Sequence, residues 1–143
     1  MPHTFISCYY HCIFSTKERA PVLTQNIQYE LYPYFGGIAQ RHRIGLLVVG
    51  GMSDHVHLLF SMPTTMSISE AMKLFKGSSS RWIHEKFPDL QEFAWQEGYG
   101  AFTVSRSILD RTIAYINNQA EHHQNMTSED EFLLLLRKHD INK

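Results

Sequence analysis

The chain has 143 residues, 43% of them hydrophobic and 19% charged, and its formal net charge at pH 7 is −1. This composition predicts one globular domain over residues 1–143 and gives no general electrostatic case for nucleic-acid binding. No basic segment followed by an apolar run starts the chain, and no apolar stretch is long enough to span a membrane, so we expect a cytoplasmic protein that does not bind membranes.

The first half of the chain predicts a strand, a helix and two further strands. Residues 5–14 are rich in β-branched and aromatic side chains and predict the first strand, on which Cys8 and Cys12 are expected to be two buried, reduced thiols. Helical spacing of apolar residues then predicts a helix over about 24–42. The apolar run 44–49 predicts a central strand, and two glycines turn the chain into an antiparallel neighbour.

The second half predicts a helix, a strand and two more helices. Ser67 or Ser69 can cap a helix whose middle, residues 76–81, is so polar that it indicates either a bend or a surface facing a polyanion. After a loop at 87–92, residues 93–104 predict a fourth strand. Helices are expected from Ser105 or Ser107 to about His123, and over 128–139. This order is that of an α+β, ferredoxin-like antiparallel sheet (βαββαβ) with additional C-terminal helices.

Two histidines stand two residues apart in the third predicted strand. Because side chains alternate across a strand, His55 and His57 share one face, whereas Val56, Leu58 and Phe60 form a wholly apolar second face. Paired neutral imidazoles are a common way to chelate a metal. The alternative is a pair of structural histidines at the end of a strand.

A tyrosine and a glutamine lie one turn apart on the helix predicted to start near residue 105. Tyr115 and Gln119 are four residues apart, so they share one face of that helix. Tyr115 could equally be a half-buried core residue with its hydroxyl satisfied by a neighbour. His122 and His123 follow as further ligand candidates, or as solvated residues at a helix C-terminus.

Four stretches together resemble the single-tyrosine HUH transposases of bacterial insertion sequences and their relatives, the REP-associated tyrosine transposases. The resemblance covers nearly the whole chain and rests on these stretches in order: Asp54-His55-Val56-His57-Leu58-Leu59, Lys76-Gly77 with Ser79 to Trp82, Trp95-Gln96-Glu97-Gly98-Tyr99, and Tyr115-Ile116-Asn117-Asn118-Gln119.

This resemblance implies a DNA transposase that cuts and rejoins single-stranded DNA through a 5′-phosphotyrosine. It implies that His55, His57 and Gln119 hold a divalent metal, Mg²⁺ or Mn²⁺, and that Tyr115 is the nucleophile. It also implies a homodimer with sites shared between subunits, and DNA with hairpin ends as the partner. The residue types themselves do not choose between the two metals.

Several cations and aromatic residues are candidates for DNA contacts. Phosphate contacts are expected from Lys17, Arg19, Lys76 and Arg81, with Ser79 in the same polar stretch as the last two. Base stacking is a possible role for Trp95, Tyr99 or Phe102, although strand aromatics mostly belong to cores. The acidic run 127–131 is a poor DNA-binding surface and is expected to lie away from the site or at a subunit contact.

Two other functions fit the same residues. The fold order is shared by non-catalytic modules that bind nucleic acid or metal. A metal-dependent phosphodiesterase that activates water would need the histidines but would leave Tyr115 with only a structural role.

Overall fold

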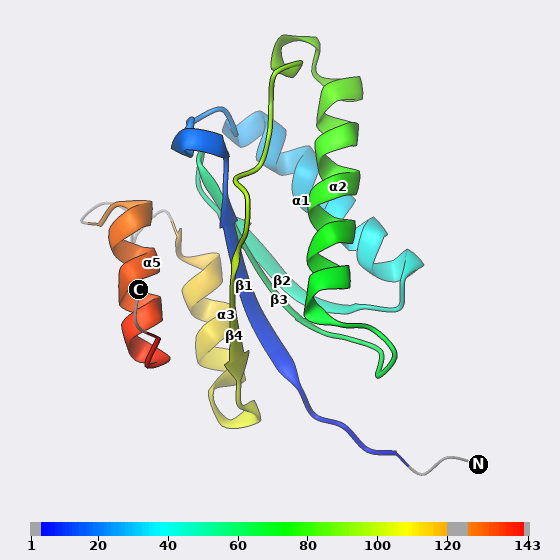
Figure 1. Ribbon diagram of the computed structural model, residues 1–143, viewed down its shortest axis with the longest axis vertical. Coiled ribbons are helices and arrows are strands. Elements are labelled where there is room, and N and C mark those ends of the chain that lie inside the picture. The colour runs from blue at the N-terminus through cyan, green and yellow to red at the C-terminus, as the bar shows by residue number, and fades with distance from the viewer. Residues whose placement is uncertain (1–3, 120–125, 142–143) are drawn as a thin grey trace.

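Four antiparallel strands and four helices make up the part of the chain that the structure, a computed structural model, describes: residues 4–119 and 126–141 (Figure 1). In chain order the elements are β1 Tyr9–Ser15, α1 Gln25–Arg41, β2 Gly45–Gly51, β3 His55–Ser61, α2 Ile68–Lys86, β4 Gly100–Val104, α3 Leu109–Asn117 and α5 Ser128–Lys138. The sheet order is β2-β3-β1-β4. The ferredoxin-like α+β order with C-terminal helices is therefore confirmed.

The two central strands fix which side chains share a face of the sheet. In the antiparallel register of β1 and β3, Ile13 pairs with His57 and Ser15 with His55. Directly paired residues point to the same face, so these four side chains lie together.

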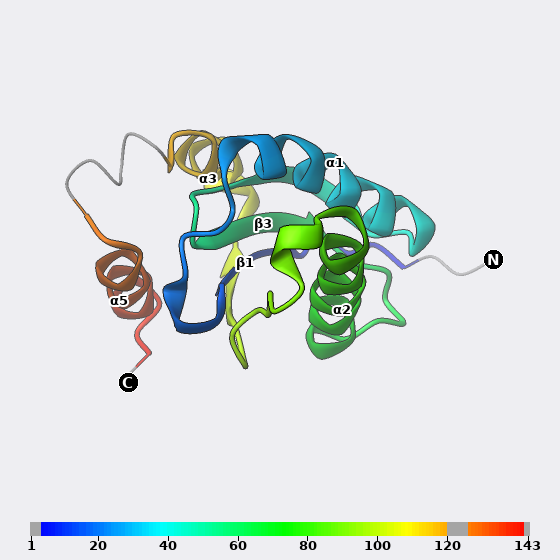
Figure 2. The ribbon, with the colours of Figure 1, turned by 90° about the horizontal axis from the view of Figure 1, so that it is seen from above.

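One face of the sheet packs against α1 and α2 and holds the larger core. Val56, Leu58 and Phe60 lie in it fully buried, as the alternation of β3 predicts, together with Cys12 and Phe14 from β1. Seen from above, α1 and α2 lie on the opposite side of β1 from α5 (Figure 2).

The opposite face carries α3 and α5, and two glycines let these helices approach closely. A Cβ on Gly50 of β2 would lie 2.3 Å from the carbonyl oxygen of Ile116 in α3. A Cβ on Gly100 of β4 would lie 2.7 Å from the ring of Phe132 in α5. A side chain at Gly50 would therefore push α3 off the sheet, whereas one at Gly100 would displace the ring of Phe132.

β1 and β4 both begin later in the chain than predicted. β1 begins at Tyr9, and Phe5 and Ile6 before it are exposed; Cys8 is exposed too, so the prediction of two buried thiols is correct only for Cys12. β4 covers only Gly100–Val104. The segment before it is irregular and makes one isolated bridge, between Thr16 and Trp95.

The polar middle of α2 is explained by contacts inside the protein. Ser67 caps the helix through its side chain, and the helix continues unbroken to Lys86. The buried Ser79 hydroxyl accepts a hydrogen bond of 2.9 Å from Trp95 Nε1, and Lys76 Nζ donates to the carbonyl oxygens of residues 96 and 98, each at 2.7 Å. These bonds attach the segment before β4 to α2.

The helix that carries Tyr115 is shorter than predicted. A 3-10 turn at Arg106–Ile108 precedes α3, which starts without a side-chain cap, so neither Ser105 nor Ser107 caps it. His122 and His123 lie outside the described residues. No helix within residues 4–119 and 126–141 has the length and apolar character needed to cross a membrane.

Candidate active site

A buried polar cluster lies between β3, the end of α3 and the first turn of α5. Antiparallel pairing points His55 and His57 away from the main core, and α3 brings Tyr115 of the same chain to them. Gln119 reaches His55 from just beyond the C-terminal end of α3. Glu131 enters from α5. His55, His57, Gln119 and Glu131 are at most 2% exposed, so their polar atoms are satisfied within the protein.

The Nε2 atoms of both histidines face the same carboxylate oxygen. Glu131 Oε1 lies 3.0 Å from His57 Nε2 and 3.3 Å from His55 Nε2. His55 Nε2 also donates to Gln119 Oε1 at 2.9 Å. Two imidazole nitrogens, a carboxylate oxygen and an amide oxygen thus converge on one point.

The second oxygen of Glu131 faces the tyrosine. Glu131 Oε2 accepts a hydrogen bond from the Tyr115 hydroxyl and another, of 3.0 Å, from Gln119 Nε2. One carboxylate therefore joins the histidine pair, through Oε1, to the phenol, through Oε2.

A second set of residues holds the outer nitrogen of each histidine. His55 Nδ1 donates to Asp54 Oδ1 at 2.7 Å, and Ser128 of α5 donates to the other oxygen of Asp54 at 2.9 Å. His57 Nδ1 lies 2.7 Å from Nε2 of His11, a buried residue of β1. Such contacts at Nδ1 orient the rings and turn Nε2 toward the centre of the site.

Burial and the mutual contacts shift the ionisation of these groups. Burial alone would lower the pKa of His55, but hydrogen bonds with Asp54, Glu131 and Gln119 outweigh it and raise this pKa to about 9. Burial alone would raise the pKa of Glu131, but hydrogen bonds from both histidines hold it well below its usual range. Without a metal, a protonated His55 thus faces an ionised carboxylate.

The pKa values of Tyr115 and His11 are also shifted, and these shifts set the protonation state of both side chains. Burial and the hydrogen bond to Glu131 raise the pKa of Tyr115 above its ordinary value, so the phenol is protonated at neutral pH. Burial and the neighbouring His57 lower the pKa of His11 to about 3. The Nε2 atom of a neutral His11 can therefore accept a hydrogen bond from a protonated Nδ1 of His57.

The donor set fits a divalent metal. His55, His57 and Glu131 each offer a ligand atom, and these atoms lie within 4.8 Å of one another. Adjacent ligand atoms that each lie about 2.1 Å from an octahedral ion are about 3.0 Å apart. Glu131 Oε1 lies 3.3 Å from His55 Nε2 and 3.0 Å from His57 Nε2, which is close to that spacing. Mixed nitrogen and oxygen ligands suit several divalent ions.

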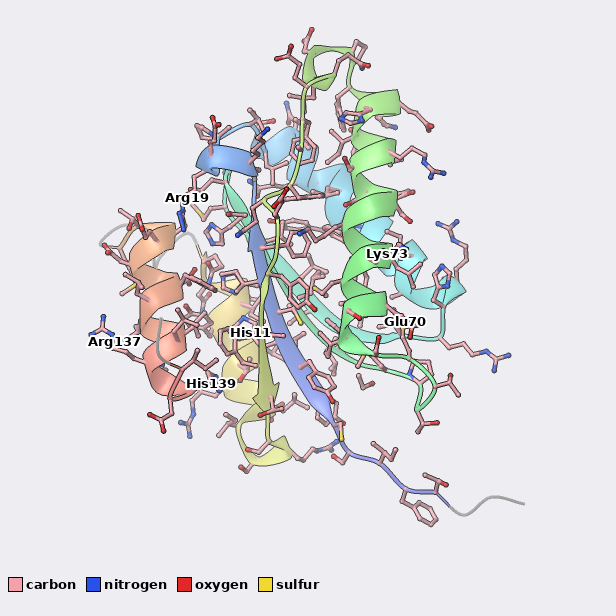
Figure 3. The ribbon with its side chains drawn as sticks, in the orientation of Figure 1. His11, Arg19, Glu70, Lys73, Arg137 and His139 are labelled. Carbon is pink, nitrogen blue, oxygen red and sulfur yellow. The ribbon has the colours of Figure 1, made fainter. Side chains whose placement is uncertain are left out.

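The residues predicted to contact DNA differ in their positions. Lys17 and Arg81 are exposed, and Arg19 is partly buried at the end of the site near the start of α5 (Figure 3). The ammonium group of Lys76 is held by two carbonyl oxygens. The prediction that Ser79 contacts DNA does not agree with the structure. Its hydroxyl is buried, accepts a hydrogen bond from Trp95 and cannot reach a phosphate.

Of the aromatic candidates, only one has an exposed ring. Trp95 and Phe102 are buried in the apolar clusters of the sheet, as the core interpretation of strand aromatics predicts. Tyr99, in the irregular segment before β4, is 37% exposed.

Glu131 and His11 were missed by sequence reasoning. Residues 127–131 were expected to lie away from the site or at a subunit contact, and the first of these is wrong for Glu131, which is fully buried in the site. The sequence feature that could have indicated burial of Glu131 is its spacing from Leu135. The two residues are four apart, lie on the same side of α5 and are both buried. His11 gave a similar signal, because it alternates with Ile13 on one face of β1.

The family model and the relatives that match this chain are all described as transposases. Residues 4–119 match the family model described as "Transposase IS200 like". The transposase of insertion sequence element IS200 from Salmonella typhimurium is 29% identical over 127 residues, covering 85% of this chain and 82% of the relative. The ISDra2 transposase TnpA of Deinococcus radiodurans is 30% identical over 115 residues, covering 77% and 82%.

Two solved structures share the fold. A transposase crystal structure from Deinococcus radiodurans R1 has a TM-score of 0.68 and 29% identity, covering 83% of this chain and 96% of that one. A REP-associated tyrosine transposase bound to a REP hairpin has a TM-score of 0.58 and 13% identity, covering 81% and 70%, and this likeness concerns the fold alone.

Proposed function

Because this chain belongs to the IS200-like transposase family and is a DNA transposase, we propose that it cuts and rejoins single-stranded DNA through a covalent link to Tyr115. The observation that supports this most is the hydrogen-bonded contact of the Tyr115 hydroxyl with a carboxylate that also contacts His55 and His57. A nucleophile, a hydrogen-bond acceptor and a metal-binding set thus lie in one buried cluster of a single domain that we take to span residues 1–143.

We propose that His55, His57 and Gln119 hold a divalent ion, Mg²⁺ or Mn²⁺, with Glu131 as a further oxygen ligand. When bound, the ion would supply positive charge that stabilises the negative charge developing on the scissile phosphate. Asp54 and His11 would keep the two imidazoles oriented, since they contact the outer nitrogens.

In the proposed reaction the Tyr115 oxygen attacks the phosphorus atom. Glu131 Oε2 accepts the phenolic hydrogen bond and so orients this oxygen, and the phenolic proton leaves to solvent as the bond to phosphorus forms. The bond between phosphorus and the 3′ oxygen breaks, and that oxygen takes a proton from solvent. The products are a 5′-phosphotyrosine and a free 3′ hydroxyl, so the bond energy is conserved for rejoining without a nucleotide cofactor.

A labelled hairpin oligonucleotide with single-stranded flanks, incubated with Mn²⁺, tests this proposal. We expect a covalent protein–DNA adduct with the wild type and none with Tyr115→Phe. Tyr99→Phe is the matched control, since that ring lies outside the cluster and should still allow adduct formation. Strand cleavage that survives in Tyr115→Phe would instead indicate a water-using phosphodiesterase. Absence of cleavage, with DNA binding unaffected by His57→Ala, would indicate a binding module.

The family resemblance also leads us to propose hairpin DNA as the partner and a homodimer with shared sites. The hairpin has support in the structural neighbour, which was solved bound to a REP hairpin. In the described chain, Tyr115 already lies beside the histidines of the same chain, so sharing requires that two subunits exchange equivalent helices. Mixing inactive Tyr115→Phe and His57→Ala subunits tests this: restored adduct formation supports exchange, and an inactive mixed dimer refutes it.

A further inference from the structure

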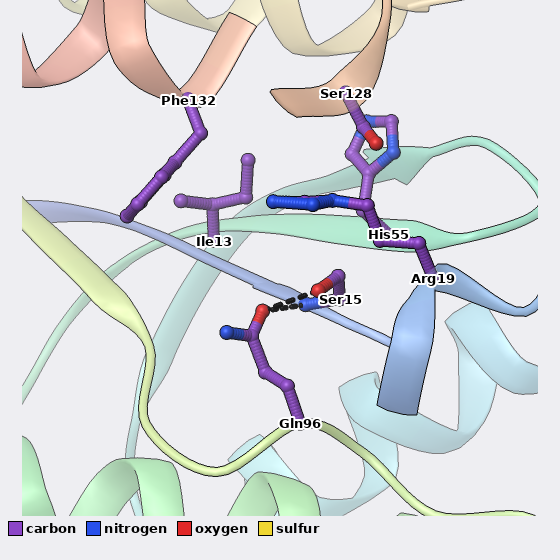
Figure 4. A pocket seen from close by; sticks show the side chains of 7 residues that line it. All are labelled: Ile13, Ser15, Arg19, His55, Gln96, Ser128 and Phe132. Carbon is purple, nitrogen blue, oxygen red and sulfur yellow. Dashed lines mark hydrogen bonds between the residues drawn. The ribbon is translucent and has the colours of Figure 1, made fainter. Parts of the chain in front are cut away.

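A pocket reaches the candidate active site from the end of β1. The pocket, of about 250 Å³, is lined by His55 on one side and by Ser15, Gln96 and Ser128 around it, with Arg19 extending into it (Figure 4). This volume is many times the roughly 10 to 15 Å³ that one water molecule needs. The pocket can therefore hold a polar group of the DNA strand next to His55, one of the proposed metal ligands.

Arg19 brings an uncompensated positive charge to this pocket. Its Nε is buried and has no hydrogen-bond partner. Within residues 4–119 and 126–141 no salt bridge involves Arg19, and none of the side chains that line the pocket is acidic. A buried donor without an acceptor is costly and rare, and an oxygen atom of a bound ligand would supply the missing acceptor.

The backbone that carries Arg19 is strained as well. Glu18 and Arg19 have φ values of 57° and 55°, in the left-handed region that residues with a Cβ rarely adopt. They belong to the 3-10 turn directly after β1, and no glycine relieves the strain. Strain of this kind persists only where the surrounding structure enforces it, and it is concentrated at ligand-binding and active sites. The side chain on this strained turn extends into the pocket (Figure 4).

We propose that Arg19 and this pocket bind a phosphodiester group of the DNA strand, adjoining the phosphate at the metal site. This inference rests on the proposed function, and it assigns the neighbouring phosphate to one residue. The guanidinium group is a planar fork that matches two phosphate oxygens, and it would satisfy the unpartnered Nε. The adjacent His55 fixes the distance of this phosphate from the site of cleavage.

The test replaces single phosphates of the hairpin substrate by uncharged methylphosphonates, one at a time, on either side of the cleavage site. With the wild type, we expect one position beside the scissile phosphate where this change weakens binding roughly 10-fold to 100-fold, the range for a hydrogen bond to a charged group. In Arg19→Met this penalty should disappear, because the charge that reads the phosphate is gone.

Lys17→Met is the matched control. Lys17 lies in the same turn but lines a different pocket, with Glu18 and Asp89, so the position-specific penalty should remain. A penalty of equal size in Arg19→Met and wild type would overturn the proposal. So would loss of the penalty in both variants, since that would indicate a general effect of charge.

Stability of the free protein separates binding from a structural role. Removing an unsatisfied buried donor should leave the urea midpoint of Arg19→Met at least as high as that of the wild type. A lower midpoint without a phosphate-specific effect would make Arg19 a structural residue. DNA binding is measured without metal, so its result does not depend on cleavage. A wild type that binds DNA but forms no adduct refutes the proposed function. The phosphate assignment is then still decided by whether the loss of affinity at one methylphosphonate position disappears in Arg19→Met.

Discussion

Replacing Gly50 by alanine should displace the helix that carries Tyr115. The new Cβ would lie 2.3 Å from the carbonyl oxygen of Ile116, about 1.1 Å short of the 3.4 Å at which ordinary contact begins. That oxygen is backbone, so no side-chain rotation relieves the clash and α3 has to move by about 1 Å. Overpacking of this kind costs about 1 to 3 kcal/mol of the free energy of unfolding, and a 1 Å misplacement can cost about 100-fold in rate.

Two assays measure these effects. Urea unfolding gives the loss of stability, and the rate of covalent adduct formation with hairpin DNA and Mn²⁺ gives the loss of activity. Gly77→Ala is the matched control, because Gly77 lies within α2 and has nothing within 4 Å of the added Cβ. It should gain about 0.5 to 1 kcal/mol and react at the wild-type rate. Wild-type stability and rate in Gly50→Ala would refute the view that close packing of α3 positions Tyr115.

Three further outcomes are expected. Glu131→Gln should weaken Mn²⁺ binding, measured by calorimetry, by at least the roughly 10-fold to 100-fold that loss of an outer-shell partner costs. Glu129→Gln, at an exposed position, should bind Mn²⁺ normally. Equal affinities of the two variants would mean that Glu131 is not a metal ligand. His11→Phe should weaken the same binding about 10-fold to 100-fold with little change in adduct formation at saturating metal, and unchanged affinity would mean that His11 does not orient the ligand. An aromatic disulfide reagent should modify Cys8 alone in the native protein and both thiols in urea, because burial raises the pKa of Cys12 to about 12; rapid native reaction of both thiols would contradict the packing of β1.

The parts of the fold that follow from local periodicity could be predicted from the sequence. Alternation in β3 correctly assigned Val56, Leu58 and Phe60 to the main core, and the helical spacing of α1 gave its limits within a residue or two. The fourth strand was predicted too long because aromatic residues indicate burial, not strand pairing. Trp95 is buried from an irregular segment that hydrogen bonds to α2 hold in place.

The site could be predicted only where its residues lie in recognisable stretches. The two β3 histidines, Tyr115 and Gln119 were named from the sequence, and the structure brings them together. Glu131 was not, because an acidic run looks solvated unless one knows where α5 docks on the sheet. That docking depends on contacts between residues more than 100 positions apart, such as Ile13 with Leu135, which no local pattern encodes.

The place of α5 gives the buried cluster a removable cover. Leu135 and Leu136 of α5 pack with Ile13 and Phe102 of the sheet in a small apolar cluster, whereas the sheet is held by the much larger cluster on its other face. Detaching α5 would open the histidines to solvent without unfolding β1 or β3, so its backbone amides should exchange hydrogen sooner than those of the central strands. The helix also lies beyond residues 4–119, the region that matches the family, so relatives with the same sheet and tyrosine helix need not share this cover.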